Sequence, residues 1–257
     1  MSNSSLVSYT RLSPCNSGKR THAIDRITPH CVVGQASVES MGSWFQDRSR
    51  ETAPNYGIGA DGRVGLYVNE CDRSWCSSSN ANDQRAVTIE CASDAESPYA
   101  FRAAVYDKLV ELCVDICKRN GKIKLIWIDD RAKALAYEPK TGEMVLTVHR
   151  WFANKSCPGD WLYSRLSALA ATVTEQLQPK PKTLYLVQTG SFSVKGYAAA
   201  QQVRLRNRGF DAILKQATVN GRTVWRVQIG AFGSKKNAEA LAAKAKAAGF
   251  DAIVRTQ

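Results

Sequence analysis

The chain has 257 residues, with 35 Lys or Arg against 23 Asp or Glu and a net charge of +12. Apolar residues make up 44% and charged residues 23%, which excludes a disordered chain and fits one large or two smaller domains. No run approaches the roughly 18 apolar residues of a membrane span, and no apolar signal segment stands at the start. We therefore expect synthesis in the cytoplasm without a signal peptide.

The N-terminal part of the chain, 1–177, alternates between predicted strands and helices. Short apolar runs predict strands over 28–34, 85–91 and 122–128. A hairpin over 55–68 turns at Ala60-Asp61-Gly62, a strong turn signal. Helical spacing predicts helices over 99–120 and 160–178, the second capped by Asp160. This order of elements predicts an α/β fold with a mixed central sheet flanked by helices over 1–177.

A second region follows a short linker. Prolines and lysines alternate around 178–182, which favours extended, solvated backbone. Beyond it the sequence repeats itself: VQTGSF at 187–192 matches VQIGAF at 227–232, and GFDAI at 209–213 matches 249–253. Each unit reads as strand, turn, amphipathic helix, glycine stop and strand. Two such units predict one small two-repeat α/β sandwich over 183–257, with one sheet face open for a ligand.

Basic residues are concentrated in this second region. Residues 183–257 hold 12 Lys or Arg against 3 Asp or Glu, whereas residues 1–179 are nearly neutral. A basic module attracts polyanions by long-range electrostatics. Charge alone does not choose between nucleic acid, anionic lipid and anionic cell-wall polymer, and the surplus also fits a solvated helix face.

Several cysteines and histidines of the chain are candidate metal ligands. We expect the eight cysteines to be mostly free thiols, with Cys113 and Cys117 packed in the core and Cys71 and Cys76 unpaired. Imidazole and thiolate are the ligands that zinc prefers, and three protein ligands with one open position make a catalytic site. The candidate ligands are His30, in an apolar strand, and His149 and Cys157, which flank a lysine. A strand histidine is also often a core residue.

Residues 1–177 resemble the zinc amidases of the phage-lysozyme and peptidoglycan-recognition type, which are N-acetylmuramoyl-L-alanine amidases. The motifs, in chain order, are Thr28-Pro29-His30, the hairpin from Asn55-Tyr56 to Asp61-Gly62, Asn82-Asp83 before Val87-Thr88-Ile89-Glu90, and His149-x5-Lys155-x-Cys157-Pro158. The resemblance implies that His30, His149 and Cys157 bind Zn²⁺. It also implies that Glu90 is the catalytic acidic residue and that Lys155 stabilises the oxyanion of the tetrahedral intermediate.

Two positions depart from the pattern of these amidases. Some relatives have a catalytic tyrosine before the hairpin, where this chain has Pro54, so we assign no catalytic role to Tyr56. Relatives also often have a tryptophan-histidine pair after the hairpin, where this chain has Trp75-Cys76. The remaining histidine, His22, lies in a polar segment and is assigned no role.

Residues 183–257 resemble a SPOR domain, on the twin VQ-x-G-[SA]-F and GFDAI segments. The resemblance implies binding to peptidoglycan, particularly to glycan strands stripped of their stem peptides. The candidate glycan contacts are Gln188, Ser191, Phe192, Trp225, Gln228 and Phe232. Both phenylalanines fit core positions beneath the sheet equally well, and Trp225 fits a place at the sheet edge.

The two resemblances together predict a zinc-dependent amidase that cleaves the bond between N-acetylmuramic acid and L-alanine, with a tail that binds glycan strands. We expect peptidoglycan as its partner, no nucleic acid, no membrane span and a monomeric protein that reaches the wall after holin-type release or lysis. The alternative is a non-catalytic peptidoglycan-binding protein. A nucleic-acid binder has little support, because basic and aromatic residues are not interleaved.

Overall fold

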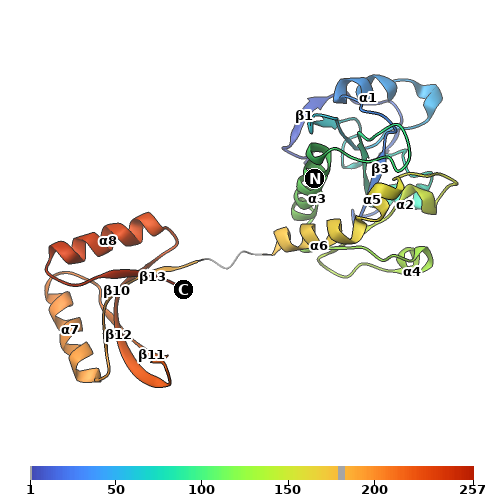
Figure 1. Ribbon diagram of the computed structural model, residues 1–257. Helices are drawn as coiled ribbons and strands as arrows, with labels where there is room; N and C mark the ends of the chain where they lie inside the picture. The colour runs from blue at the N-terminus through green and yellow to red at the C-terminus, as the bar shows by residue number, and fades with distance from the viewer. Residues whose placement is uncertain (1, 179–182) are drawn as a thin grey trace. The chain divides into compact units, whose positions relative to one another are not determined.

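The computed structural model describes residues 2–178 and 183–257. The chain divides into two compact units, Met1–Pro179 and Lys180–Gln257, drawn in Figure 1. Each unit has a hydrophobic core of its own. Of the linker predicted over 178–182, residues 179–182 lie outside the described residues. In the part of the chain that is described, no helix is both long enough and apolar enough to cross a membrane.

A seven-stranded mixed sheet forms the centre of the N-terminal unit. In spatial order its strands are β1 (Val7–Thr10), β5 (Val64–Leu66), β4 (Tyr56–Ile58), β7 (Ala86–Cys91), β3 (Arg26–Cys31), β9 (Glu143–Leu146) and β8 (Lys124–Ile126). Neighbouring strands are parallel, except that β4 and β5 form the predicted antiparallel hairpin. The prediction of a mixed sheet flanked by helices is confirmed.

Helices and a small ribbon surround this sheet (Figure 1). They are α1 (Val38–Trp44), α2 (Asn80–Arg85), α3 (Ala103–Arg119), α4 (Arg131–Ala136), α5 (Asp160–Tyr163), α6 (Leu166–Leu177), the 3₁₀ turns η1 (Arg48–Arg50) and η2 (His149–Trp151), and the strand pair β2 (Asn16–Lys19) and β6 (Asp72–Ser74). The apolar face of α3 is buried, and α6 packs against α3 and β8. Cys113 and Cys117 are buried on α3, as predicted, and each of the eight cysteines is free.

Two helix boundaries differ from the sequence prediction. The helix expected over 99–120 begins at Ala103, because Tyr99 has a φ of 60° and cannot continue a right-handed helix. The helix expected over 160–178 is split into α5 and α6. Its N-cap is Gly159, at φ 81°, rather than Asp160. A side chain at Gly159 would approach the Pro98 carbonyl to 2.8 Å, so glycine is required there.

The C-terminal unit is a four-stranded antiparallel sheet in the order β11 (Ile213–Val219), β12 (Arg222–Phe232), β10 (Tyr185–Phe192) and β13 (Ile253–Thr256). Helices α7 (Lys195–Asn207) and α8 (Lys235–Ala247) pack on one face. The repeats interlock, because β11 of the first pairs with β12 of the second and β13 pairs with β10. Register shifts skip Thr189 and Ile229, which occupy equivalent positions in the two sequence repeats.

Candidate metal centre

The candidate centre lies where parallel strands of the N-terminal unit end. His30 is on β3, and Glu90 is its direct partner on the neighbouring strand β7. On the other side of β3 lies β9, also parallel, and the chain after β9 enters η2 at His149. The carboxyl ends of parallel strands meet at one edge of a sheet. The fold therefore brings together residues that are far apart in the sequence.

The three predicted ligands lie side by side. The ligand atoms of His30, His149 and Cys157 all lie within 4.8 Å of one another. The Cys157 Sγ is 3.3 Å from the His30 Nδ1, and the centroids of the two imidazole rings are 5.1 Å apart. Two imidazoles and a thiol in this arrangement form a donor set that suits a zinc ion with one position left for a fourth ligand.

Burial holds the three candidate ligands in their uncharged forms. Burial, together with the nearby His149, holds the pKa of His30 well below its usual value, so its ring is neutral and able to ligate. Burial and the charge of Lys155 lower the pKa of His149. Hydrogen bonding with Cys31 and burial raise the pKa of Cys157. A cation would offset these effects on the thiol, because metal binding displaces its proton.

Two buried polar atoms in the centre have no hydrogen-bond partner among the described residues. They are the His30 Nε2 and the Glu90 Oε2. Buried polar groups are nearly always satisfied, and a bound ion is one of the partners that satisfies such atoms. These atoms and the donor chemistry together show that the residues present fit a zinc ion.

Glu90 faces this group of ligands from β7. Its side chain is only 16% exposed, and its Oε1 is 3.9 Å from the His30 Nδ1. The buried Cys76 thiol lies 3.8 Å from the same carboxylate oxygen. Burial raises the pKa of Glu90 to about 7. A carboxyl with a pKa near neutrality is suited to accept and return a proton at physiological pH.

A cleft of about 750 Å³ opens beside the centre. His149 and the predicted Lys155 line it, and the Ser78 hydroxyl lies 2.9 Å from the His149 Nε2. Arg50 and Arg73 also line the cleft, and the sequence analysis did not single them out. Neither arginine belongs to a sequence motif, and the place of η1 and β6 beside the cleft depends on tertiary contacts that sequence spacing does not specify.

A buried hydrogen-bond network holds the strands of the centre in place. The Asn82 amide donates to the hydroxyls of Thr28 on β3 and Ser77, and its oxygen accepts from the Thr147 hydroxyl. The Asp83 carboxylate accepts from the backbone N–H groups of Cys76 and Ser77. The Asn82-Asp83 pair thus fixes one wall of the cleft rather than contributing a ligand.

Tyr56 lies outside the centre. It is fully buried on β4, and its hydroxyl donates to the Glu70 carboxylate at 2.7 Å and accepts from the Ser4 backbone N–H. Arg119 pairs with the same carboxylate. The tyrosine therefore belongs to a structural network. His22 is exposed, and its Nδ1 lies 2.9 Å from the hydroxyl of its neighbour Thr21.

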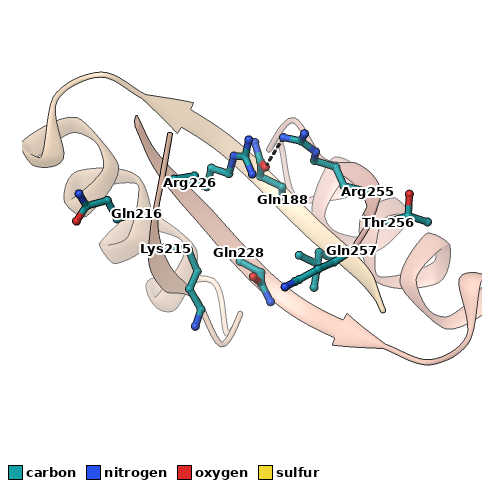
Figure 2. A pocket seen from close by; sticks show the side chains of 10 residues that line it. Gln188, Lys215, Gln216, Arg226, Gln228, Arg255, Thr256 and Gln257 are labelled. Carbon is teal, nitrogen blue, oxygen red and sulfur yellow. Dashed lines mark hydrogen bonds between the residues drawn. The ribbon is translucent and has the colours of Figure 1, made fainter. Parts of the chain in front are cut away.

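The predicted glycan contacts in the C-terminal unit fall into two groups. Gln188 and Gln228 are direct cross-strand partners and line one groove (Figure 2). Gln188 also lines a second cavity, with Ser191 and Phe192. Phe192 and Phe232 are partly buried and pack against the hydrophobic core of the unit, in line with the core alternative given for the two phenylalanines. Trp225, for which a place at the sheet edge was the alternative, packs against the same core.

The N-terminal unit is therefore a mixed α/β domain with a candidate metal site. A small domain built from two sequence repeats follows it. The sequence pattern of the N-acetylmuramoyl-L-alanine amidase family matches residues 20–160, and that of the SPOR domain matches residues 181–256. The chain belongs to the N-acetylmuramoyl-L-alanine amidase family and carries a SPOR domain. Amidase action on peptidoglycan in the cell wall follows from this membership.

Several solved structures resemble parts of the chain. The peptidoglycan-binding domain of the Bacillus subtilis cell wall lytic enzyme CwlC is 45% identical, with 31% of this chain and 96% of that one covered and a TM-score of 0.27. A mutant Bacillus subtilis endolysin is 13% identical, with coverage of 64% and 97% and a TM-score of 0.44. The Staphylococcus aureus hydrolase AmiA is 12% identical, with coverage of 66% and 82% and a TM-score of 0.46. Curated protein sequences give no match.

Proposed function

We propose that this amidase depends on zinc and hydrolyses the bond between N-acetylmuramic acid and L-alanine, while its SPOR domain binds glycan strands. The observation that carries the proposal is the convergence of His30, His149 and Cys157 beside the buried carboxyl of Glu90. When bound, zinc lowers the pKa of a coordinated water to about 7 and polarises a carbonyl.

Glu90 acts as the general base and then as the general acid. Its pKa of about 7 means that a substantial fraction is ionised at neutral pH and ready to accept the proton of the attacking water. The same carboxyl then delivers a proton to the nitrogen of the departing L-alanine. Its position directly opposite His30 on the neighbouring strand keeps it beside the candidate ligands.

Lys155 stabilises the negative charge that develops on the carbonyl oxygen. It lines the cleft beside His149, and its charge already influences the pKa of that histidine. A cation placed where an oxyanion forms stabilises the transition state more than the ground state, because the neutral amide of the substrate attracts it less. We therefore expect Lys155 to contribute to turnover more than to substrate binding.

The test is the release of new L-alanine amino termini from purified cell walls, with and without a zinc chelator. We expect release that stops on chelation and returns with added zinc. Glu90→Ala should keep the zinc and lose turnover, while the control Glu175→Ala, at an exposed position on α6, should match the wild type. Wall binding without release, even with zinc added, would instead indicate a non-catalytic peptidoglycan-binding protein.

A further inference from the structure

Ser78 has a strained backbone conformation beside the cleft. It lies in the segment 75–79, between β6 and α2, and has a φ of 60°. In this left-handed region the Cβ of a residue other than glycine comes too close to the following carbonyl oxygen, so serine seldom adopts it. Strain of this kind persists where the surrounding structure enforces it, and it is frequent at functional sites. The contacts of the Ser78 side chain are therefore informative about function.

The residues on both sides of Ser78 fix this conformation. The Asp83 carboxylate accepts the backbone N–H groups of Cys76 and Ser77, at 3.1 and 3.2 Å. Ser79 is the N-cap of α2, and its hydroxyl accepts a backbone N–H of the first turn of that helix at 3.3 Å. Because the chain is anchored immediately before and immediately after Ser78, its backbone cannot relax without breaking these bonds.

The side chain held in this way contacts a candidate ligand. The Ser78 Oγ lies 2.9 Å from the His149 Nε2, within hydrogen-bond distance, although the two residues are 71 positions apart. A neutral imidazole has one N–H group and one lone pair, on different nitrogens. The ring binds a cation through the lone pair, so the nitrogen that donates to a neighbour must be the other one. A hydrogen bond from Nε2 to Ser78 therefore leaves Nδ1 free for an ion.

We propose that Ser78 is a positioning residue of the metal centre, whose hydroxyl accepts the Nε2–H of His149 and so presents the Nδ1 lone pair to zinc. The serine acts through the histidine and does not itself touch the ion. Histidine ligands generally donate their second ring N–H to such a partner, and loss of the partner typically weakens metal affinity by about 10–100-fold. The inference rests on the proposed zinc dependence of the amidase, because Ser78 has this role only when His149 binds the ion.

The first experiment uses Ser78→Gly in the full-length protein. Glycine removes the hydroxyl and also relieves the strain, because it adopts positive φ freely. We expect zinc affinity, measured by competition against a chromophoric chelator, to fall by about 10–100-fold. We also expect the metal-free variant to unfold at a urea concentration equal to or above that of the wild type. A residue that only supports the fold would instead lower both quantities together.

Ser78→Ala removes the hydroxyl but keeps the strain. Its zinc affinity should fall by the same factor as that of Ser78→Gly, while its urea midpoint should lie below that of the glycine variant. Ser167→Ala is the matched control, because Ser167 is exposed on α6 and loses the same hydroxyl. It should leave zinc affinity within about twofold of the wild type. Wild-type zinc affinity in both Ser78 variants would overturn the proposal.

The protonation of the His149 ring is a second, spectroscopic readout. The chain has three histidines, so long-range ¹H–¹⁵N correlation spectra can separate the three rings. In the zinc-loaded wild type we expect the His149 proton on Nε2, protected from exchange with solvent by its bond to Ser78. In Ser78→Gly the same proton should exchange faster, while the exposed His22 should be unchanged. A proton on Nδ1 of His149 in the wild type would overturn the proposal.

Release of L-alanine amino termini by the wild-type enzyme is measured separately. Zinc binding that depends on Ser78, without any such release, would refute the catalytic proposal and leave the role of Ser78 standing. Zinc-dependent release together with equal zinc affinity in the wild type and both Ser78 variants would refute the role of Ser78 alone. Failure of the wild type to bind zinc at all would refute both.

Discussion

The buried carboxyl of Glu90 gives a stability prediction with a definite sign. Its pKa in the folded protein is about 7 against an ordinary value of 4.5, so between these values the folded state keeps a proton that the unfolded state has lost. The stability that this proton confers is fully present below pH 4.5 and is lost as the pH rises through 7. At pH 8 the free energy of unfolding is lower by about 3 kcal/mol than below pH 4.5. This prediction is for the metal-free protein, because a bound cation would compensate the charge of the carboxylate.

Glu90→Gln removes the ionisation and keeps the shape of the side chain. We expect the free energy of unfolding of the metal-free variant, relative to wild type, to rise by about 2–3 kcal/mol between pH 5 and pH 8. Urea unfolding followed by tryptophan fluorescence measures it, because five of the six tryptophans lie in the N-terminal unit. The control Glu175→Gln, at an exposed site, should show no such change. An equal difference at both pH values would refute the reasoning that Glu90 is held neutral by burial.

Three further variants test separate parts of the account. Lys155→Met should lower kcat by about 10²–10³ while zinc content and KM stay near the wild-type values, which steady-state kinetics on wall fragments will show. Cys157→Ser should weaken zinc binding in a competition titration against a chromophoric chelator without changing the circular dichroism spectrum; wild-type affinity would remove Cys157 from the ligand set. Tyr56→Phe should lower the free energy of unfolding by about 1–3 kcal/mol and leave turnover intact, because its hydroxyl serves the buried Glu70 network; lost turnover in a stable variant would contradict that assignment.

Features that rest on local pattern could be predicted from the sequence. The turn at Ala60-Asp61-Gly62 joins an antiparallel pair because Asp61 and Gly62 supply the turn conformation: the Asp61 carboxylate accepts the Arg63 N–H, and Gly62 has φ 81°. The sequence repeat predicted a symmetric domain, and the skipped residues Thr189 and Ile229 keep that symmetry in the register.

Features that depend on tertiary contacts could not be predicted in this way. The split between α5 and α6 leaves no break in the apolar periodicity, and the preference for Gly159 arises from the distant Pro98 carbonyl. The approach of His30 to Cys157 needs the order of β7, β3 and β9 in the sheet, which sequence spacing does not specify. The sequence therefore predicts which residue types form the site, whereas the order of the strands determines how close their side chains lie.

The repulsive pair of Lys215 and Arg226 is a further example. Each residue reads as an ordinary exposed cation in the sequence, and only the register between β11 and β12 makes them direct partners. Like charges placed opposite each other lower the stability of a sheet, and the overall charge of the domain does not reveal such a pair.

Zinc X-ray absorption spectroscopy on the metal-loaded protein tests the central claim most directly. The account predicts one ion per chain with two imidazole nitrogens at about 2.0–2.1 Å, one sulfur at about 2.3 Å and a light oxygen ligand in the fourth position. Loss of the sulfur signal in Cys157→Ser would locate that ligand. A spectrum with two sulfurs, closed by the nearby Cys76, or with no imidazole nitrogen, would contradict a centre made of His30, His149 and Cys157 with a position open to solvent.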